Sequence, residues 1–231
     1  MSHHATSPHC RDNAHKALGD AQLQRALGNM RTGFPERRAA AAARLPEFEA
    51  LRDSARDIKN HVLAHLDLYL EIYAAKVEAA GGHVHFCRDA AQANQTIVDI
   101  CKSLGAKTVT KGKSMISEEI GLNDALDAAG VKPIETDLGE YIIQLRGETP
   151  SHIIAPAIHL NKEQVEGDFR RVHQHLPKER DLSQPVQLLT EARGVLREKF
   201  LAADVGVTGA NFLVAETGSS IIVTNEGNGD L

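Results

Sequence analysis

The chain has 231 residues, 42% of them hydrophobic and 25% charged, which is typical of a globular protein and argues against wholesale disorder. A net charge of −5 and an aromatic content of 4% argue against a nucleic-acid-binding protein, which normally has a basic face and stacking side chains. No stretch approaches the roughly 20 apolar residues of a membrane span, and the polar N-terminus is no secretory signal. Three widely spaced cysteines form neither a disulfide framework nor a CxxC metal site, so a reduced, cytoplasmic compartment is expected.

The first third of the sequence predicts helices. Apolar residues recur at spacings of three and four from Phe48 to Val77, which predicts one long amphipathic helix. Gly81 and Gly82 are expected to end it. We therefore expect residues 1–82 to form an N-terminal helical region, whose long helix is either a packing arm or part of an interface.

From residue 83 onward, strand patterns alternate with helix patterns. This alternation predicts right-handed βαβ units and an α/β fold with a mostly parallel sheet flanked by helices. We expect residues 83–231 to form this α/β domain. The predicted strands cover residues 83–87, 107–111, 131–135, 151–156, 205–207, 211–214 and 220–224, and the predicted helices cover residues 90–104, 114–129, 162–175 and 188–202.

A lysine-rich turn stands where the second of these strands meets a helix. In the sequence Lys111-Gly112-Lys113-Ser114, the serine is placed to cap the helix. Two lysines beside a helix N-terminus are suited to bind an anion. The turn is no P-loop, because the first glycine of that motif would fall at Lys107, and the chain has no GxGxxG motif. The alternative is an ordinary solvated turn before a capped helix.

Three carboxylates follow the next predicted strand. Glu135, Asp137 and Glu140 lie at the strand end, where α/β folds bind ligands. They can hold a cation, orient a hydroxyl group or act as a general base. The alternative is a polar loop in which Thr136 or Asp137 caps a helix.

A third group lies between the last two predicted strands. Glu216 and Thr217 stand among glycines there, and Asn225 and Glu226 follow the second of these strands. An acid on a strand edge beside glycines can act as a nucleophile or a base. The alternative is a hairpin turn whose polar residues face solvent.

The twelve histidines do not predict a metal site. His61 and His65 share a helix face, and His152 and His159 flank an apolar run, but none has a carboxylate or cysteine at ligand spacing. We expect no metal in this chain.

Four blocks of sequence, taken in order, resemble a known family. Each block alone is a weak signal, whereas four in the same order are specific. They resemble the LUD domain of the lactate-utilisation protein B family, and the resemblance covers nearly the whole chain from about Leu18. The blocks are KSMISEEI (113–120) with Asn123, ETDLGEYI (135–142), PSHIIAPAIH (150–159), and GVTGANF (206–212) with AETG (215–218) and NEGN (225–228).

The resemblance implies an α/β fold similar to that of sugar-phosphate isomerases and CoA transferases. It also implies a function: members of the family act with two partner proteins in the oxidation of L-lactate to pyruvate, as the iron–sulfur electron carrier. In the family a segment that binds 4Fe–4S clusters follows the LUD domain. This chain has no CxxCxxCxxxC run, so we expect no cofactor in it and interpret it as a fragment or a truncated homologue whose domain is incomplete at its C-terminal end.

The resemblance also implies a set of site residues, which we expect to meet at the carboxyl ends of the strands as one pocket. Glu216 is the candidate reactive carboxylate, by analogy with CoA transferases. The candidate ligand-binding residues are Lys111, Lys113, Ser114, Glu135, Asp137, Glu140, Asn211, Thr217, Asn225 and Glu226.

Three functions remain open from the sequence. The first is a subunit of a lactate-oxidising, electron-transferring complex, which would not be an enzyme alone. The second is a stand-alone enzyme acting on an acyl-CoA or a sugar phosphate, with Glu216 at its centre. The third is a docking module that uses the apolar stripe of the long helix.

Overall fold

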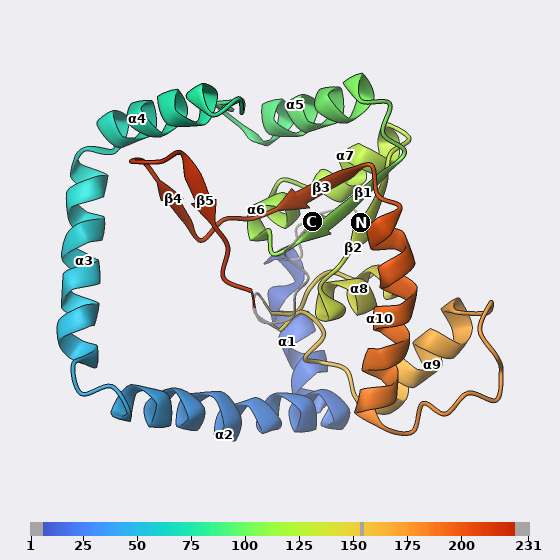
Figure 1. Cartoon of the computed structure of the whole chain (residues 1–231). Coiled ribbons are helices and arrows are strands. Elements are labelled where there is room, and N and C mark those ends of the chain that lie inside the picture. The colour runs from blue at the N-terminus through green and yellow to red at the C-terminus, as the bar shows by residue number, and fades with distance from the viewer. Residues whose placement is uncertain (1–6, 153–154, 225–231) are drawn as a thin grey trace. The chain divides into compact units, whose positions relative to one another are not determined.

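The computed structural model describes residues 7–152 and 155–224, except the side chains of residues 29–32 (Figure 1). The chain forms two compact units, and the boundary at residues 82 and 83 remains a prediction. The first unit contains residues 1–26, 87–210 and 222–231, and the second contains residues 27–86 and 211–221.

The first unit is built on a parallel sheet of β1 (Thr108–Gly112), β2 (Lys132–Glu135) and β3 (Val205–Thr208), in the order β2-β1-β3. The middle strand β1 is buried along most of its length, as expected for a strand covered on both faces. Pro133 lacks an N–H group and is tolerated because β2 is an edge strand. The register places Lys111 beside both Glu135 and Val207, so the three strands end at the same edge.

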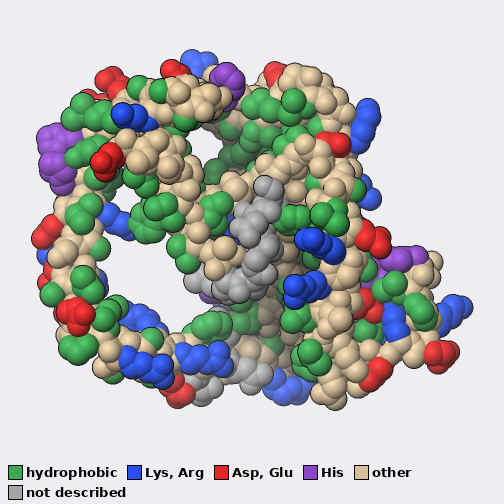
Figure 2. Space-filling model, viewed as in Figure 1, with side chains coloured by type: hydrophobic (Ala, Val, Ile, Leu, Met, Phe, Trp, Pro, Cys, Tyr) green, Lys and Arg blue, Asp and Glu red, His purple; other side chains and the backbone are tan. Residues whose placement is uncertain are grey.

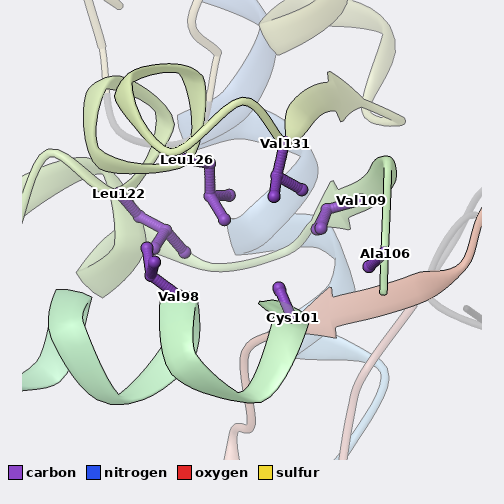
Figure 3. Close-up of a cluster of buried hydrophobic side chains, with 7 residues drawn as sticks. All are labelled: Val98, Cys101, Ala106, Val109, Leu122, Leu126 and Val131. Atoms are coloured by element: carbon purple, nitrogen blue, oxygen red, sulfur yellow. The ribbon is translucent and has the colours of Figure 1, made fainter. Parts of the chain in front are cut away.

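Helices α5 (Ala90–Ser103) and α7 (Leu122–Ala128) pack against this sheet through a hydrophobic core (Figure 3). Asp89 fixes the start of α5 by accepting a hydrogen bond from the backbone N–H of Gln92 at 2.8 Å. The short helix α6 (Met115–Glu119) lies between β1 and α7 in the chain. The core consists of Val98, Cys101, Ala106, Val109, Leu122, Leu126 and Val131.

A second core joins helices α8 (Leu138–Arg146), α9 (Lys162–Val172) and α10 (Pro185–Leu201). It contains buried Tyr141 and Phe169, and the Tyr141 hydroxyl is 2.9 Å from Nε2 of buried His173. Nδ1 of His173 is 2.8 Å from a carboxylate oxygen of Glu191, which also pairs with Arg180. Because α8 also packs on β2, its N-terminus lies close to the carboxyl ends of the strands.

The N-terminal segment starts with a 3-10 turn, η1 (Ser7–His9), and helix α1 (Cys10–Gly19), both in the first unit. Helix α2 (Ala21–Ala43) runs from the first unit into the second. An N-terminal helical segment is therefore present, as predicted.

The second unit also contains helices α3 (Phe48–Ala64) and α4 (Leu66–Ala79) and the hairpin of β4 (Phe212–Val214) and β5 (Ser219–Ile221). Tyr73 of α4 reaches the hairpin, with its hydroxyl 2.8 Å from the Ser220 hydroxyl. None of the described side chains of this unit is buried. Figure 2 shows hydrophobic side chains exposed along its helices.

The prediction of one long helix from Phe48 to Val77 is wrong at His65. This residue has φ −132° and ψ 36°, which ends α3 and begins α4. A hydrogen bond of 3.1 Å between His61 and Tyr69 spans the break. No glycine or proline marks this position, so the periodicity alone could not reveal the break.

Three further element predictions differ from the structure. Residues 83–87 form no strand, and the described part of residues 151–156 forms bends and a turn, while Ile153 and Ile154 lie outside the described residues. The helix predicted at 114–129 is divided into α6 and α7 by Gly121, whose φ of 68° is left-handed.

The predicted fold class is confirmed, because a parallel three-stranded sheet is flanked by helices in an α/β arrangement. Among the described residues, no helix is both long and apolar enough to cross a membrane.

Candidate functional site

The carboxyl ends of β1 and β2 carry a buried group of charged side chains. Lys111 and Glu135 are register partners on neighbouring strands, and side chains of register partners point to the same face of a sheet. Both residues are 1% exposed. Each of these two buried ionisable groups needs a partner of opposite charge, because a single buried charge without a partner is strongly unfavourable.

The ammonium group of Lys111 has three partners. Its Nζ atom is 2.8 Å from Oε1 of Glu135 and 3.1 Å from the hydroxyl of Ser117, and it also pairs with Glu118. Asn123 of α7 donates a hydrogen bond from Nδ2 to Oε1 of Glu135 at 2.7 Å. Helices α6 and α7 therefore supply the side chains that surround the Lys111–Glu135 pair.

In this group, burial and neighbouring charges shift the pKa values of Lys111 and Glu135 in opposite directions. Burial lowers the pKa of Lys111, but Glu135 and Glu118 outweigh it, so the pKa of the lysine is raised and its positive charge is kept. Burial raises the pKa of Glu135 by more than Lys111 and Asn123 lower it. The pKa of the lysine and the pKa of its carboxylate partner are therefore both raised.

Glu140, in the first turn of α8, is a further buried acid on which the charges of this group act. Its side chain is 7% exposed, and burial, followed by the negative charge of Glu135, raises its pKa to about 8. Among the described residues, no hydrogen-bond donor reaches Oε2 of Glu140, Oε2 of Glu135 or Oδ1 of Asn123. We call Lys111, Ser117, Glu118, Asn123, Glu135 and Glu140 the buried cluster.

A strained loop forms the rim beside this cluster. Lys113 has φ +57°, which is rare for a residue with a side chain, and its ammonium group is 2.9 Å from a carboxylate oxygen of Asp137. Ser114 caps α6, and Asp137 caps α8 by accepting a hydrogen bond from the N–H of Gly139. Gly209, after β3, lies so close that a Cβ atom there would be 2.1 Å from the Lys113 carbonyl oxygen.

The structure therefore brings six of the predicted site residues together, from the lysine-rich turn and the carboxylate block. Both lysines pair with carboxylates, so an incoming anion would compete with them. The six residues are Lys111, Lys113, Ser114, Glu135, Asp137 and Glu140.

No contact within the described part of the chain joins the remaining predicted residues to this group. Glu216 and Thr217 lie at the exposed turn of the β4–β5 hairpin, and Asn211 precedes β4; all three belong to the second unit. Asn225 and Glu226 lie outside the described residues. That these five join the buried cluster stays a prediction.

Sequence reasoning missed Ser117, Glu118 and Asn123 as partners of Lys111 and Glu135. They stand in the KSMISEEI block and at Asn123 after it, and no contact with Lys111 or Glu135 was predicted for them. The available signal was spacing, because Ser114, Ser117 and Glu118 recur at three and four residues, which places them on one helix face.

A second polar group was also missed. Nδ1 of His159 is 2.8 Å from the Ser151 hydroxyl and its Nε2 is 2.9 Å from Glu148, which also pairs with Arg146 at 2.8 Å. The Ser151 hydroxyl also reaches the Pro156 carbonyl, at 2.9 Å. These contacts hold the loop after α8 against the end of that helix, so His159 is fixed by a serine and a carboxylate.

The cysteines do not fit a 4Fe–4S cluster. Cys101 is fully buried in the hydrophobic core, and Cys10 and Cys87 are exposed and free. Within the described residues, no three His, Cys, Asp or Glu side chains gather in a way that could hold a metal ion.

Comparison with known families identifies the domain. The family model described as LUD domain matches residues 70–231. The chain belongs to the LUD-domain family. This match contains all three strands of the sheet and every residue of the buried cluster.

Curated relatives of this LUD-domain chain share one name. The Lactate utilization protein B of Macrococcus caseolyticus (strain JCSC5402) is 47% identical over 212 residues, which cover 91% of this chain and 44% of the relative. The protein of the same name from Bacillus subtilis (strain 168) is 42% identical over 224 residues, covering 96% of this chain and 46% of the relative. The chain thus spans less than half the length of the curated relatives it matches. No solved structure matches the chain.

Proposed function

We propose that this chain is the LUD-domain part of a protein that takes part in lactate utilisation. The observation that carries the proposal is the identity of 42–47% to proteins named Lactate utilization protein B, over more than nine-tenths of this chain. The buried cluster supports it in a second way, since two of the sequence blocks that carry the resemblance meet at one edge of the sheet.

A chimera tests this proposal. In a Bacillus subtilis strain that lacks its Lactate utilization protein B, the segment matched by this chain is replaced with the chain itself. We expect the chimera to restore growth on L-lactate as sole carbon source, as the reintroduced native protein must. Growth on glucose serves as the viability control. A chimera that accumulates to the native level and does not support growth on lactate contradicts the proposal.

The finer part of the proposal concerns the complete protein. We infer that it is the iron–sulfur electron carrier of a complex that oxidises L-lactate to pyruvate, together with two other lactate-utilisation proteins in the cytoplasm. Its 4Fe–4S clusters would be held outside the described residues, because the three cysteines here do not fit one. Within that protein, this chain would supply an α/β domain with the buried cluster at the strand ends.

Reconstitution tests this inference. The complete protein and both partners are mixed with L-lactate and a redox dye, and dye reduction is followed. We expect reduction only when all three proteins are present. Reduction that persists without the complete protein, or no reduction in the full mixture with clusters loaded, contradicts it.

A docking function is the second candidate, and the second unit favours it. Leu51 and Ile58 lie two turns apart on α3, and both are more than half exposed. Because such apolar surface normally marks an interaction site, we expect Leu51→Ser with Ile58→Ser to weaken binding of the partner proteins in a pull-down. Lys59→Ser on the same helix is the control, and equal binding by both variants argues against docking through α3.

A further inference from the structure

The loop after α8 holds a serine, a histidine and a glutamate in one hydrogen-bonded series. The Ser151 hydroxyl oxygen is 2.8 Å from Nδ1 of His159, and Nε2 of the same imidazole is 2.9 Å from Oε2 of Glu148. Arg146 donates from Nε to the other carboxylate oxygen of Glu148, at 2.8 Å. A hydroxyl, an imidazole and a carboxylate in this order are the nucleophile, base and orienting acid of acyl-transfer sites.

The tautomer of His159 follows from its carboxylate partner. Burial raises the pKa of Glu148, but hydrogen bonds from His159 and Arg146 lower it by more, so Glu148 is ionised and can only accept hydrogen bonds. Nε2 of His159 therefore carries a hydrogen and donates it to Glu148. A neutral imidazole with its hydrogen on Nε2 has an acceptor at Nδ1, which faces the Ser151 hydroxyl.

The Pro156 carbonyl competes with His159 for the hydroxyl hydrogen. It is 2.9 Å from the Ser151 hydroxyl oxygen, and it also accepts a hydrogen bond from the backbone N–H of Ser151 at 3.0 Å. The carbonyl therefore keeps a donor when the hydroxyl turns away from it, and this turn costs little. The hydroxyl hydrogen is thus available to Nδ1 of His159.

The backbone holds the histidine in place and leaves the serine accessible. The His159 carbonyl accepts a hydrogen bond from Nε2 of Gln22 at 2.9 Å, and the next residue, Leu160, packs against the second core. Ser151 is exposed, so a substrate can reach its hydroxyl oxygen. A base fixed by its own surroundings beside an accessible hydroxyl is the arrangement that a nucleophile requires.

We propose that Ser151 is a nucleophile that takes up the acyl group of a carboxylic ester, with His159 as its general base and Glu148 as the residue that positions the histidine. Oγ of Ser151 forms a bond to the ester carbonyl carbon, and the hydroxyl proton passes to Nδ1 of His159. As the bond from that carbon to the leaving oxygen breaks, the proton passes from Nδ1 to this oxygen, and an alcohol departs. Water then attacks the ester on Ser151 with the same proton transfers and releases the acid. This activity goes beyond the role in lactate utilisation and does not depend on it.

Covalent labelling of the full chain tests the proposal. Because Ser151 is exposed, water solvates the oxyanion of the intermediate, so we expect slow turnover and measure formation of the covalent bond instead. In a fluorophosphonate probe, the serine oxygen attacks phosphorus and fluoride leaves, and mass spectrometry locates the label. We expect a single label, on Ser151. A chain with no label on Ser151, or with other serines labelled equally fast, overturns the proposal, and this arm needs no variant to fold.

A variant of the base then separates an activated serine from an accessible one. His159→Gln should slow labelling of Ser151 by about 100-fold or more, because a positioned base contributes at least that factor. Ser103→Ala is the control, since Ser103 is also exposed and its hydroxyl donates to the Ile100 carbonyl at 2.8 Å, and it should leave the labelling of Ser151 unchanged. Folded His159→Gln that is labelled at the wild-type rate overturns the proposal.

The role of Glu148 has its own readout, the tautomer of His159. In 15N NMR of the imidazole we expect the hydrogen on Nε2 in the wild type. In Glu148→Gln we expect a smaller fraction of this tautomer, together with labelling slowed by about 100-fold. Slower labelling with an unchanged tautomer assigns Glu148 a structural role only and overturns its part in the proposal.

Discussion

Two groups of charged side chains in the first unit each contain a glutamate, and the pKa of that glutamate is shifted in opposite directions in the two groups. In the buried cluster, Glu140 is 7% exposed and its pKa is raised to about 8. In the group of Arg146, Glu148 and His159, the Glu148 side chain is 38% exposed and its pKa is lowered. A positive charge lowers the pKa of each glutamate, so the difference lies in solvent access and in the direct hydrogen bonds that Glu148 receives. The direction of each pKa shift therefore depends on whether direct hydrogen bonds to the carboxylate outweigh its burial.

Removal of the central cation should have the largest effect. Lys111→Met leaves buried Glu135 and partly buried Glu118 without this cation, so we expect the free energy of unfolding to fall by about 3–5 kcal/mol in urea denaturation. Lys113→Met is the matched control, because the Lys113–Asp137 pair is about one-fifth exposed, and it should cost no more than about 1 kcal/mol. Equal losses of stability in the two variants would contradict the distinction between the fully buried pair and the partly exposed pair.

The close approach of two strand ends gives the next largest effect. Gly209→Ala places a Cβ 2.1 Å from the Lys113 carbonyl oxygen, which forces the rim loop to move. We expect a loss of about 2–3 kcal/mol, a value typical of overpacking. Gly194→Ala, in α10 with nothing within 4 Å of the new Cβ, should instead stabilise the protein by about 0.5–1 kcal/mol, because it improves helix propensity. Thermal unfolding of both variants distinguishes these opposite signs.

Neutralising Glu140 should stabilise the protein. Its folded pKa of about 8 lies above the ordinary value of 4.5, so the folded state holds more protons than the unfolded state between these values. Stability is then greatest below about pH 4.5 and falls as the pH rises to about 8, by about 1.4 kcal/mol per unit. Glu140→Gln removes this loss and should be more stable than wild type at pH 7 by on the order of 2 kcal/mol. Chemical denaturation from pH 5 to pH 8 checks the slope, and a variant less stable than wild type at pH 7 contradicts it.

The three strands of the sheet could be located from the sequence, although two further predicted strands do not form in the described residues, and the partners in the site could not be located. The three strands of the sheet were predicted within about one residue of their bounds. Short runs rich in β-branched residues, next to glycines, are typical of strands. Lys111 and Glu135 were predicted as site residues because the carboxyl ends of the strands can be predicted from the sequence pattern. Glu118 and Asn123 reach them only after α6 and α7 fold back, and the break at Gly121 that allows this was hidden inside an apparent helix.

The contact between His159 and Glu148 could not be predicted from the sequence either. The two residues are separated by a loop without regular periodicity, so their pairing at 2.9 Å depends on tertiary structure alone. The histidines were considered as metal ligands, which usually stand at characteristic short spacings in the sequence. His159 instead contacts a serine and a carboxylate that do not stand at such spacings.

Replacement of Glu148 should give the smallest effect and the opposite pH dependence. Burial raises the pKa of Glu148, but hydrogen bonds from His159 and Arg146 outweigh it and lower the pKa. A lowered pKa stabilises the fold above about pH 4.5, and this contribution is lost as the pH falls through the lowered value. Glu148→Gln should therefore lose less than about 1 kcal/mol at pH 7, since the side chain is partly in solvent, and the difference from wild type should shrink in acid. If Glu148→Gln instead gained stability at pH 7, as expected for Glu140→Gln, the two groups would not differ by burial, and the contrast drawn between them would be wrong.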